Sequence, residues 1–339
     1  MLGSGDRLSC TASNFIAIFA LAAGILCSSS GHAERVRVAI PGLSPNSAFF
    51  MVAVQKKYFA EEKIEVDVIQ AGGGTAIPAL VSGDMQFSAS TGSAVSAILK
   101  GAKLKVIMVG QDRPGAQIWS SRPNIKSLTD LRGQQIGIQS RGDTGEMAIL
   151  ALLKKSGLSR DYVSFTPMGT GGTRLAALKS KTLPAVLVNW FEIAELRPSD
   201  LGDAHPVIDL YGDVRMPYNG LATSDALIRN NSDLLNRFLR ASLKGVAYTL
   251  AYHAESVRLV SEYAKMPLEV TKFDFDKMIV STLPDGVVSP EMQSNEIALR
   301  MELLGSTGQS PPPNSAVFDF SAVENISKEL QASGWKPTP

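Results

Sequence analysis

The alternation of short strand patterns with helical patterns constrains the fold of this chain more than any other feature. Arg35 to Pro41 places apolar residues on one face, as a half-buried strand does. A helical pattern follows from Ser44 to Tyr58, and Ile64 to Ile69 alternates again. Strand and helix patterns keep alternating as far as Val109, in the order βαβαβ. This order predicts an α/β fold with a mainly parallel sheet flanked by helices.

A second series of the same units lies further along the chain. Its strand and helix patterns cover, in order, Gln135–Gln139, Asp143–Ser156, Val163–Pro167, Thr173–Lys181 and Pro184–Asn189. Proline and glycine cluster at residues 113–115 and again at 216–220. We expect these two clusters to be a pair of segments that cross between two α/β units.

Residues 1–33 are predicted to be an export signal peptide. Phe15 to Leu26 is an uncharged apolar run of 12 residues. A helix needs about 20 residues to span a membrane, so this run is too short for a transmembrane helix. Small residues ending at Ala33 match the pattern of a signal peptidase site, so we expect cleavage before Glu34 and a periplasmic mature protein. A permanent membrane anchor is the alternative interpretation.

Cysteine use follows from this prediction. The two cysteines, Cys10 and Cys27, both lie in the predicted signal peptide. A lipid-modified Cys27 is disfavoured, because Leu26 stands where the lipoprotein pattern needs a small residue. The mature protein would therefore have no disulfide, no cysteine nucleophile and no thiolate metal site. No later segment approaches 18 apolar residues, so we expect the mature protein not to be membrane-embedded.

Charge and motifs exclude further classes. The chain has 33 Lys and Arg against 32 Asp and Glu, so no overall field attracts nucleic acid. Of the three histidines, His205 and His253 lie beyond the signal, and neither has a second metal ligand at close spacing. The sequence also lacks the G-x-S-x-G, H-E-x-x-H and Walker A motifs. We therefore predict no enzyme activity, no metal and no cofactor.

Hydroxyl and glycine residues gather where strand patterns pass into helix patterns. These junctions are Ser44–Ser47, Gly72–Thr75, Ser90–Ser93, Ser140–Thr144 and Gly169–Thr173. In a parallel sheet such junctions meet at the carboxyl ends of the strands, where ligands bind. Free N–H groups at helix starts favour a negative or strongly polar ligand group. Each junction alone could be an ordinary helix cap, but five together predict a polar cleft.

Three larger side chains are further candidates. Arg141 stands at the mouth of the second unit and could clamp a carboxylate or sulfonate, or could be a solvated loop arginine. Trp190 follows a strand end directly and could stack on a ligand or pack in the core. Arg174 lies just inside a helical pattern, and we expect it on the surface.

The chain resembles the periplasmic substrate-binding proteins of ABC importers, in the group similar to nitrate, sulfonate and taurine binders and to Thi5-like (NMT1-like) proteins. Four motifs carry the resemblance, which extends over about residues 35–250. They are Tyr58–Val66 (YFAEEKIEV), Gly72–Thr75 (GGGT), Leu80–Phe87 (LVSGDMQF) and Asp130–Gly137 (DLRGQQIG).

The resemblance implies a two-lobed periplasmic binding protein type II fold. Lobe 1 would comprise residues 34–113 and 221–339, and lobe 2 residues 114–220. It also implies a monomeric receptor that takes a small molecule into the cleft and delivers it to an ABC permease with its ATPase. With the junction residues, the predicted ligand-binding set is Ser44, Asn46, Gly74, Thr75, Ser90, Thr91, Ser140, Arg141, Thr144, Asn189 and Trp190.

The ligand is predicted to be an anion such as a sulfonate, a carboxylate or a nitrate-like ion, with Arg141 as its charge partner. Many relatives carry an acidic residue near the position of Asn189, and the neutral amide weakens the case for a cation. Two alternatives stay open: a Thi5-like pyrimidine-related enzyme, and a ligand-binding partner of a membrane sensor. The missing cysteine-rich motif disfavours the enzyme.

Overall fold

Alternating burial along the first strand explains how the fold begins. In β1 (Glu34–Ile40), Val36 and Val38 are fully buried, whereas Arg35 and Arg37 point away from the core. The computed structural model describes residues 33–194, 202–306 and 309–339. The predicted signal peptide lies outside the described residues apart from Ala33, and so do both cysteines.

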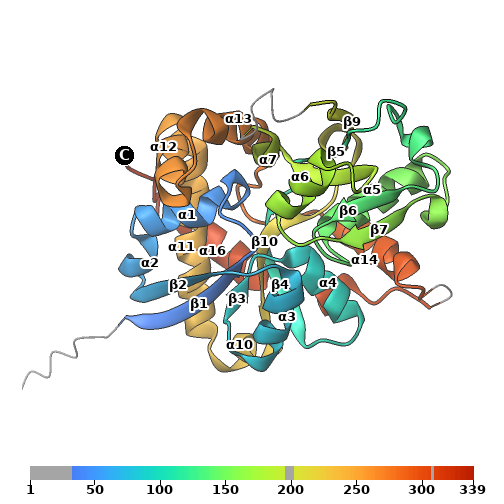
Figure 1. Ribbon diagram of the computed structural model, residues 1–339. Helices are drawn as coiled ribbons and strands as arrows, with labels where there is room; N and C mark the ends of the chain where they lie inside the picture. Colours follow the sequence, from blue (N-terminus) through green and yellow to red (C-terminus); the bar gives the residue numbers. More distant parts are fainter. Residues whose placement is uncertain (1–32, 195–201, 307–308) are drawn as a thin grey trace, which may run out of the picture. The chain divides into compact units, whose positions relative to one another are not determined.

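The strands form two five-stranded sheets within the unit of residues 33–339 (Figure 1). The first sheet contains, in spatial order, β2 (Ile64–Gln70), β1, β3 (Phe87–Ser88), β10 (Tyr218–Ser224) and β4 (Leu104–Gln111). The second sheet contains β7 (Ser164–Pro167), β6 (Gln135–Ile138), β8 (Ala185–Asn189), β5 (Ala116–Ser120) and β9 (His205–Asp209).

Each sheet holds one reversed strand. β10 pairs antiparallel with β3 and β4, and β5 pairs antiparallel with β8 and β9, whereas β1 and β6 pair in parallel with both neighbours. Four of the five strands in each sheet therefore run the same way, which matches the predicted mainly parallel sheets. The chain leaves the first sheet after Gln111, enters the second at Ala116 and returns at Tyr218. The predicted lobe boundaries stay a prediction, because residues 33–339 form one compact unit.

Helices flank both sheets. Those in the first part of the chain are α1 (Ala48–Gln55), α2 (Tyr58–Glu61), α3 (Gly73–Ser82), α4 (Thr91–Leu99), α5 (Thr144–Lys155), α6 (Gly171–Lys179), α7 (Trp190–Ala194) and α9 (Leu210–Asp213). The later ones are α10 (Asp225–Asn230), α11 (Ser232–Ala251), α12 (His253–Ala264), α13 (Leu268–Met278), α14 (Pro290–Leu303), α15 (Asn314–Val317) and α16 (Ser321–Ala332). Among the described residues, no helix is both long enough and apolar enough to cross a membrane.

Each sheet has its own hydrophobic core. Helix α11 buries its apolar stripe against the first sheet, where the ring of Phe238 stacks on Phe87 at 3.8 Å between centroids. In the second sheet, Ile136 and Ile138 of β6 pack with Met147 of α5. These cores lie on the faces of the sheets and so leave the carboxyl ends of both sets of strands uncovered.

Candidate functional site

A cavity of about 570 Å³ lies where the carboxyl ends of the strands in the two sheets face each other. We call the side formed by residues 41–47, 70–75 and 89–93, after β1, β2 and β3, the neutral wall. The side formed by the cavity-lining residues within 139–140, 143–145, 169–175 and 187–192, around β6, β7 and β8, is the charged wall. The predicted meeting of the strand-to-helix junctions is thus what the structure displays.

The structure brings most of the predicted ligand-binding residues together on this cavity. Nine of them lie on its surface: Ser44, Asn46, Gly74, Thr75, Ser90, Thr91, Ser140, Thr144 and Asn189. Arg141 and Trp190 are not among the residues that line it. Ligand contact by any of them stays a prediction.

The neutral wall consists of helix starts, hydroxyls and amides. Helices α3 and α4 begin side by side. A Cβ on Gly73 of α3 would lie only 2.0 Å from the Ser93 hydroxyl oxygen of α4. Two buried polar atoms, Asn46 Oδ1 and Ser90 Oγ, have no hydrogen-bond partner among the described residues. Buried polar atoms rarely stay unpaired in proteins, so these two retain unused hydrogen-bonding capacity on the wall.

The charged wall is organised by Arg174, whose predicted surface position is wrong. Its side chain is 2% exposed and pairs with Glu192, with Nη2 2.8 Å from Oε1 and 3.1 Å from Oε2. Its other nitrogens donate to the carbonyl oxygens of Leu187 at 2.6 Å and Gly169 at 2.7 Å. Helix α6 packs on β8, and this packing turns a residue that looks like a surface arginine inward.

Glu192 supplies the acidic group that the neutral Asn189 lacks. Its Oε2 accepts the backbone N–H of Asn189 at 2.9 Å, and its Oε1 accepts the Asn189 side-chain amide at 3.2 Å. A Cβ on Gly171 would lie 2.0 Å from Oε1, so glycine is needed where α6 begins. The acid therefore lies three residues after the strand end, outside the predicted ligand-binding set.

Asp143 is the third charged residue of this wall. It caps α5 by accepting the backbone N–H groups of Glu146 and Ser140, each at 2.8 Å. Burial raises the pKa of its carboxyl, and the two backbone hydrogen bonds oppose this shift. The Ser140 hydroxyl beside it is buried without a partner among the described residues.

Arg141 and Trp190 have other surroundings. The Arg141 side chain is 60% exposed and pairs with Glu146, Nη1 to Oε1 at 2.6 Å, because this acid lies in the first turn of α5. Trp190 is buried against Tyr211, with ring centroids 4.7 Å apart. Its neighbour Phe191 lines the cavity instead.

The sequence of this chain matches a family profile described as NMT1/THI5 like over residues 44–256. The chain belongs to the NMT1/THI5-like family. The resemblance seen in its motifs is therefore confirmed, and the match covers both walls of the cavity.

A curated relative of this NMT1/THI5-like chain is the riboflavin-binding protein RibY of Chloroflexus aurantiacus. The two are 33% identical over 233 residues, which are 65% of this chain. The matched part spans 64% of the length of that relative.

Solved structures show the same fold. The ligand-binding component of an ABC-type import system from Staphylococcus aureus, with zinc bound, superposes with a TM-score of 0.72 at 16% identity, over 87% of this chain and 99% of that one. The periplasmic aliphatic sulphonate binding protein SsuA of Escherichia coli gives 0.65 at 15% identity, over 84% and 92%. The predicted periplasmic binding protein fold of this NMT1/THI5-like chain is confirmed.

The cavity of this NMT1/THI5-like chain is lined mainly by hydroxyls, amides and glycines. Among the described residues that line it there is no histidine, cysteine or lysine. Across the part of the chain that the structure describes, no group of three or more His, Cys, Asp or Glu side chains is placed to hold a metal ion. Hydroxyls, amides, backbone N–H groups and one internally paired arginine can orient a polar molecule.

Proposed function

We propose that this chain is an extracytoplasmic receptor, not an enzyme, that captures a small polar ligand between its two walls and delivers it to an ABC permease with its ATPase. Membership of the NMT1/THI5-like family supports this proposal, as does the fold shared with an import-system component. The cavity, of about 570 Å³, has the size typical of small-molecule sites. Periplasmic export and a monomeric state belong to the same proposal.

The mechanism that we propose is closure of the walls on the ligand. A ligand that touches both walls binds the closed form better than the open form, and only such a difference shifts the equilibrium. The permease then recognises the closed form. Since the crossing strands β5 and β10 both begin at the cavity, with Ala116 and Tyr218 lining it, closure and binding involve the same backbone.

One observation supports the ligand class most directly. Asn46 Oδ1, Ser90 Oγ and Ser140 Oγ are buried on the cavity wall and have no partner among the described residues. An amide oxygen can only accept a hydrogen bond, whereas hydroxyls both donate and accept. We therefore propose an uncharged polar ligand that carries at least one N–H or O–H donor beside its acceptors.

The predicted anionic ligand loses its main support here. Arg141 does not line the cavity, and the guanidinium of Arg174 is occupied by Glu192 and two carbonyl oxygens. A nitrate ion or a simple alkyl sulfonate ion has no donor to offer Asn46 Oδ1. Helix starts on both walls still favour an electron-rich group, which a neutral heterocycle with carbonyl oxygens provides. The riboflavin named for the curated relative has this chemistry.

Native mass spectrometry of the freshly purified protein tests the proposal, followed by thermal shift with two ligand panels. One panel holds neutral N–H heterocycles, including riboflavin and pyrimidines, and the other holds nitrate, sulfonates and carboxylates. We expect stabilisation by the first panel only. Stabilisation by the anions alone would show that the proposed ligand class is wrong.

The two alternative functions have their own readouts. Turnover of a bound heterocycle during incubation would indicate a Thi5-like enzyme. Binding of the liganded protein to a membrane sensor, without stimulation of a permease ATPase, would indicate a sensory partner. A receptor for import is expected to stimulate the ATPase of its permease when it carries ligand.

A further inference from the structure

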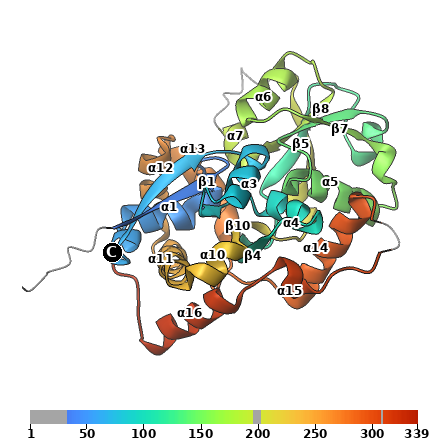
Figure 2. The same cartoon turned by 90° about the horizontal axis from the view of Figure 1, so that it is seen from below.

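Helix α14 joins the cores of the two sheets beneath the cavity. Its residues Ile297 and Met301 belong to the core of the first sheet, whereas Leu299 packs against the core of the second. The helix contacts both α4 and α5, and Figure 2 shows it beside these two helices. Helix α14 thus spans the junction between the two walls, although it comes late in the chain.

One arginine of this helix bonds to the segments that adjoin both walls. Arg300 is fully buried, and its Nη1 donates to the Ser96 hydroxyl of α4 at 2.7 Å and to the Gly142 carbonyl at 2.7 Å. The Ser96 hydroxyl itself donates to the same carbonyl at 2.9 Å. Glu296, one turn earlier, holds Nε of Arg300 at 2.5 Å. Ser96 lies one turn after the neutral wall, and Gly142 directly precedes Asp143 of the charged wall.

Glycines allow the walls to meet at this place. A Cβ on Gly92 would lie 2.2 Å from Thr144 Oγ1 and 3.0 Å from Nη2 of Arg300. Gly142 has a φ of +74°, and a Cβ there would lie 2.9 Å from the Ser96 hydroxyl oxygen. Any movement that separates α4 from α5 would therefore break the Arg300 bonds on one side.

The pair is poorly suited to a purely stabilising role. Nη2 of Arg300 and Oε2 of Glu296 are buried without a hydrogen-bond partner among the described residues. Removing two charges from water is expensive, and a buried ion pair with incomplete hydrogen bonding often contributes nothing to stability. Such a pair can instead select one arrangement of the parts that it joins.

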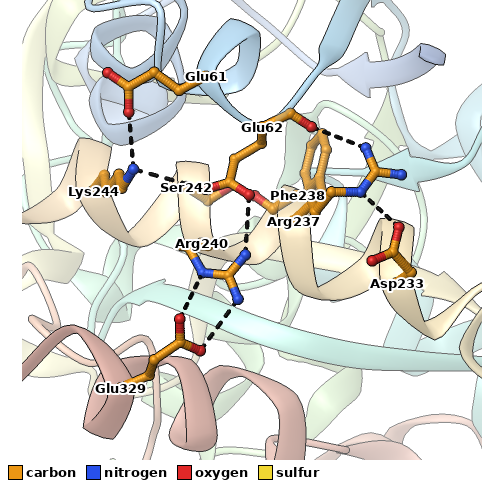
Figure 3. A network of polar contacts seen from close by, with 9 residues as sticks. All are labelled: Glu61, Glu62, Asp233, Arg237, Phe238, Arg240, Ser242, Lys244 and Glu329. Carbon is orange, nitrogen blue, oxygen red and sulfur yellow. Dashed lines mark hydrogen bonds and ion pairs between the residues drawn. The ribbon is translucent and has the colours of Figure 1, made fainter. Parts of the chain in front are cut away.

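A second network provides the contrast (Figure 3). Arg240 of α11 bonds to Glu62 at 3.0 Å and to Glu329 of α16 at 3.2 Å, and Lys244 bonds to Glu61 at 2.8 Å. These partners follow or belong to helices that pack with α11, on the side of the first sheet. The Arg240 network therefore fastens one half of the unit, whereas Arg300 fastens the neutral wall to the charged wall.

We infer that Arg300 and Glu296 are a positioning pair that holds the two walls together and sets the fraction of the protein in the closed, binding-competent form without touching the ligand. This inference rests on the proposed receptor function. If only a fraction of the protein is competent, the apparent dissociation constant rises by the inverse of that fraction. Loss of the pair should thus weaken ligand binding, although neither residue lines the cavity.

Distances between spin labels test the inference without any ligand. Labels are placed at Val81→Cys on α3 and Lys179→Cys on α6, both exposed, in the full chain with Cys10→Ser and Cys27→Ser. We expect the ratio of short to long distances to fall at least about fivefold in Arg300→Gln, within the range of ordinary conformational couplings.

The matched control is Arg240→Gln, which removes the same group from a network on one side only. It should lower the melting temperature and leave the distances unchanged. If Arg300→Gln does not fold, Ser96→Ala removes the Arg300 bond to α4 and the direct bond between Ser96 and Gly142 but keeps the Arg300 bond to Gly142, and we expect a smaller shift in the same direction.

Identical distance distributions in the folded variant and the parent protein, whether short or long, would overturn the inference. This readout needs no ligand, so a failure of the receptor proposal remains distinguishable from it. If the distance distribution shifts but no ligand is found, the positioning role of the pair stands and only its link to ligand binding is refuted.

Discussion

The two walls of the cavity differ in how they present polarity. The neutral wall offers hydroxyls, amides and helix starts and has no charged side chain among its described residues. The charged wall carries Arg174, Glu192 and Asp143, but these groups bond to one another or to backbone. The charged groups hold this wall in place, and the hydrogen-bonding groups that have no partner are those left for a ligand. A charged residue on a cavity wall therefore need not be a charge partner of the ligand.

The strongest effect should come from Arg174→Met. This change leaves Glu192 buried without its cation and removes donors to two carbonyl oxygens. Breaking a buried pair in this way costs about 3–5 kcal/mol. Urea unfolding at pH 7 measures the loss in the free energy of unfolding.

The control for this change is the double variant Arg174→Met with Glu192→Gln. It should lose less than the sum of the two single changes, because the unpaired charge is gone. A loss below about 1 kcal/mol in the single variant would mean that charge does not organise this wall.

Asp274 lies between the two walls and gives a pH-dependent effect. Its helix α13 contacts both α7 and the 3-10 turn Pro45–Ser47, and its carboxyl is fully buried. Burial raises its pKa to about 7, Glu192 adds to the shift and Lys277 opposes it. In the unfolded chain the pKa of this carboxyl returns to its ordinary value of 3.8.

Stability should therefore fall as the pH rises from about 4 to about 7, because the folded protein keeps a proton that the unfolded chain has lost. The loss is on the order of 4 kcal/mol across this window and levels off above it. Asp274→Asn should remove the slope and raise the melting temperature at pH 8. An unchanged slope in thermal melts at several pH values would count against this assignment.

On the neutral wall, Ser90→Ala should weaken ligand binding about three- to tenfold, since one hydrogen bond contributes about 0.5–1.5 kcal/mol. The melting temperature of the free protein should hardly change, because the hydroxyl has no partner among the described residues. Calorimetric titration with the heterocycle that is identified by mass spectrometry measures the change. Ser121→Ala, another buried unpaired hydroxyl outside the cavity lining, is the control. An equal loss in both variants would refute the assignment.

The smallest effect is expected for Arg141→Ala. The side chain is largely exposed and pairs with Glu146, so its loss should change stability by less than about 1 kcal/mol and ligand affinity by less than twofold. The same titration measures the affinity. A tenfold weaker affinity would mean that the charged wall extends beyond the described cavity.

The sequence predicted the parallel part of the fold well. Strands such as β1 and β6 show an apolar pattern that reflects burial against flanking helices. The reversed strands β5 and β10 were not predicted, because residues 216–220 were interpreted as a crossing connection and residues 116–120, directly after the crossing cluster at 113–115, were not assigned to a strand. Pairing between residues 65 or more positions apart decides their conformation, and the local sequence pattern does not reveal it.

The sequence predicted those parts of the candidate site that are created by the backbone geometry. Hydroxyls and glycines at strand-to-helix junctions meet because parallel strands end together. The buried positions of Arg174 and Arg300 were not predicted, because an arginine within a helix looks the same in sequence whether it faces water or a core. Glu296 and Arg300 even have the spacing of an ordinary exposed pair on a helix surface.

The start of β10 has a consequence for how this protein can change over evolutionary time. Tyr218 and Asn219 line the cavity, and Tyr218, paired with Gln111, is also the first rung of the ladder that returns the chain to the first sheet. If the walls close on a ligand as proposed, a new side chain at these positions would alter both the ligand specificity and the backbone on which closure depends. Divergence toward other ligands should therefore collect at wall positions that carry no such double duty, such as Phe191.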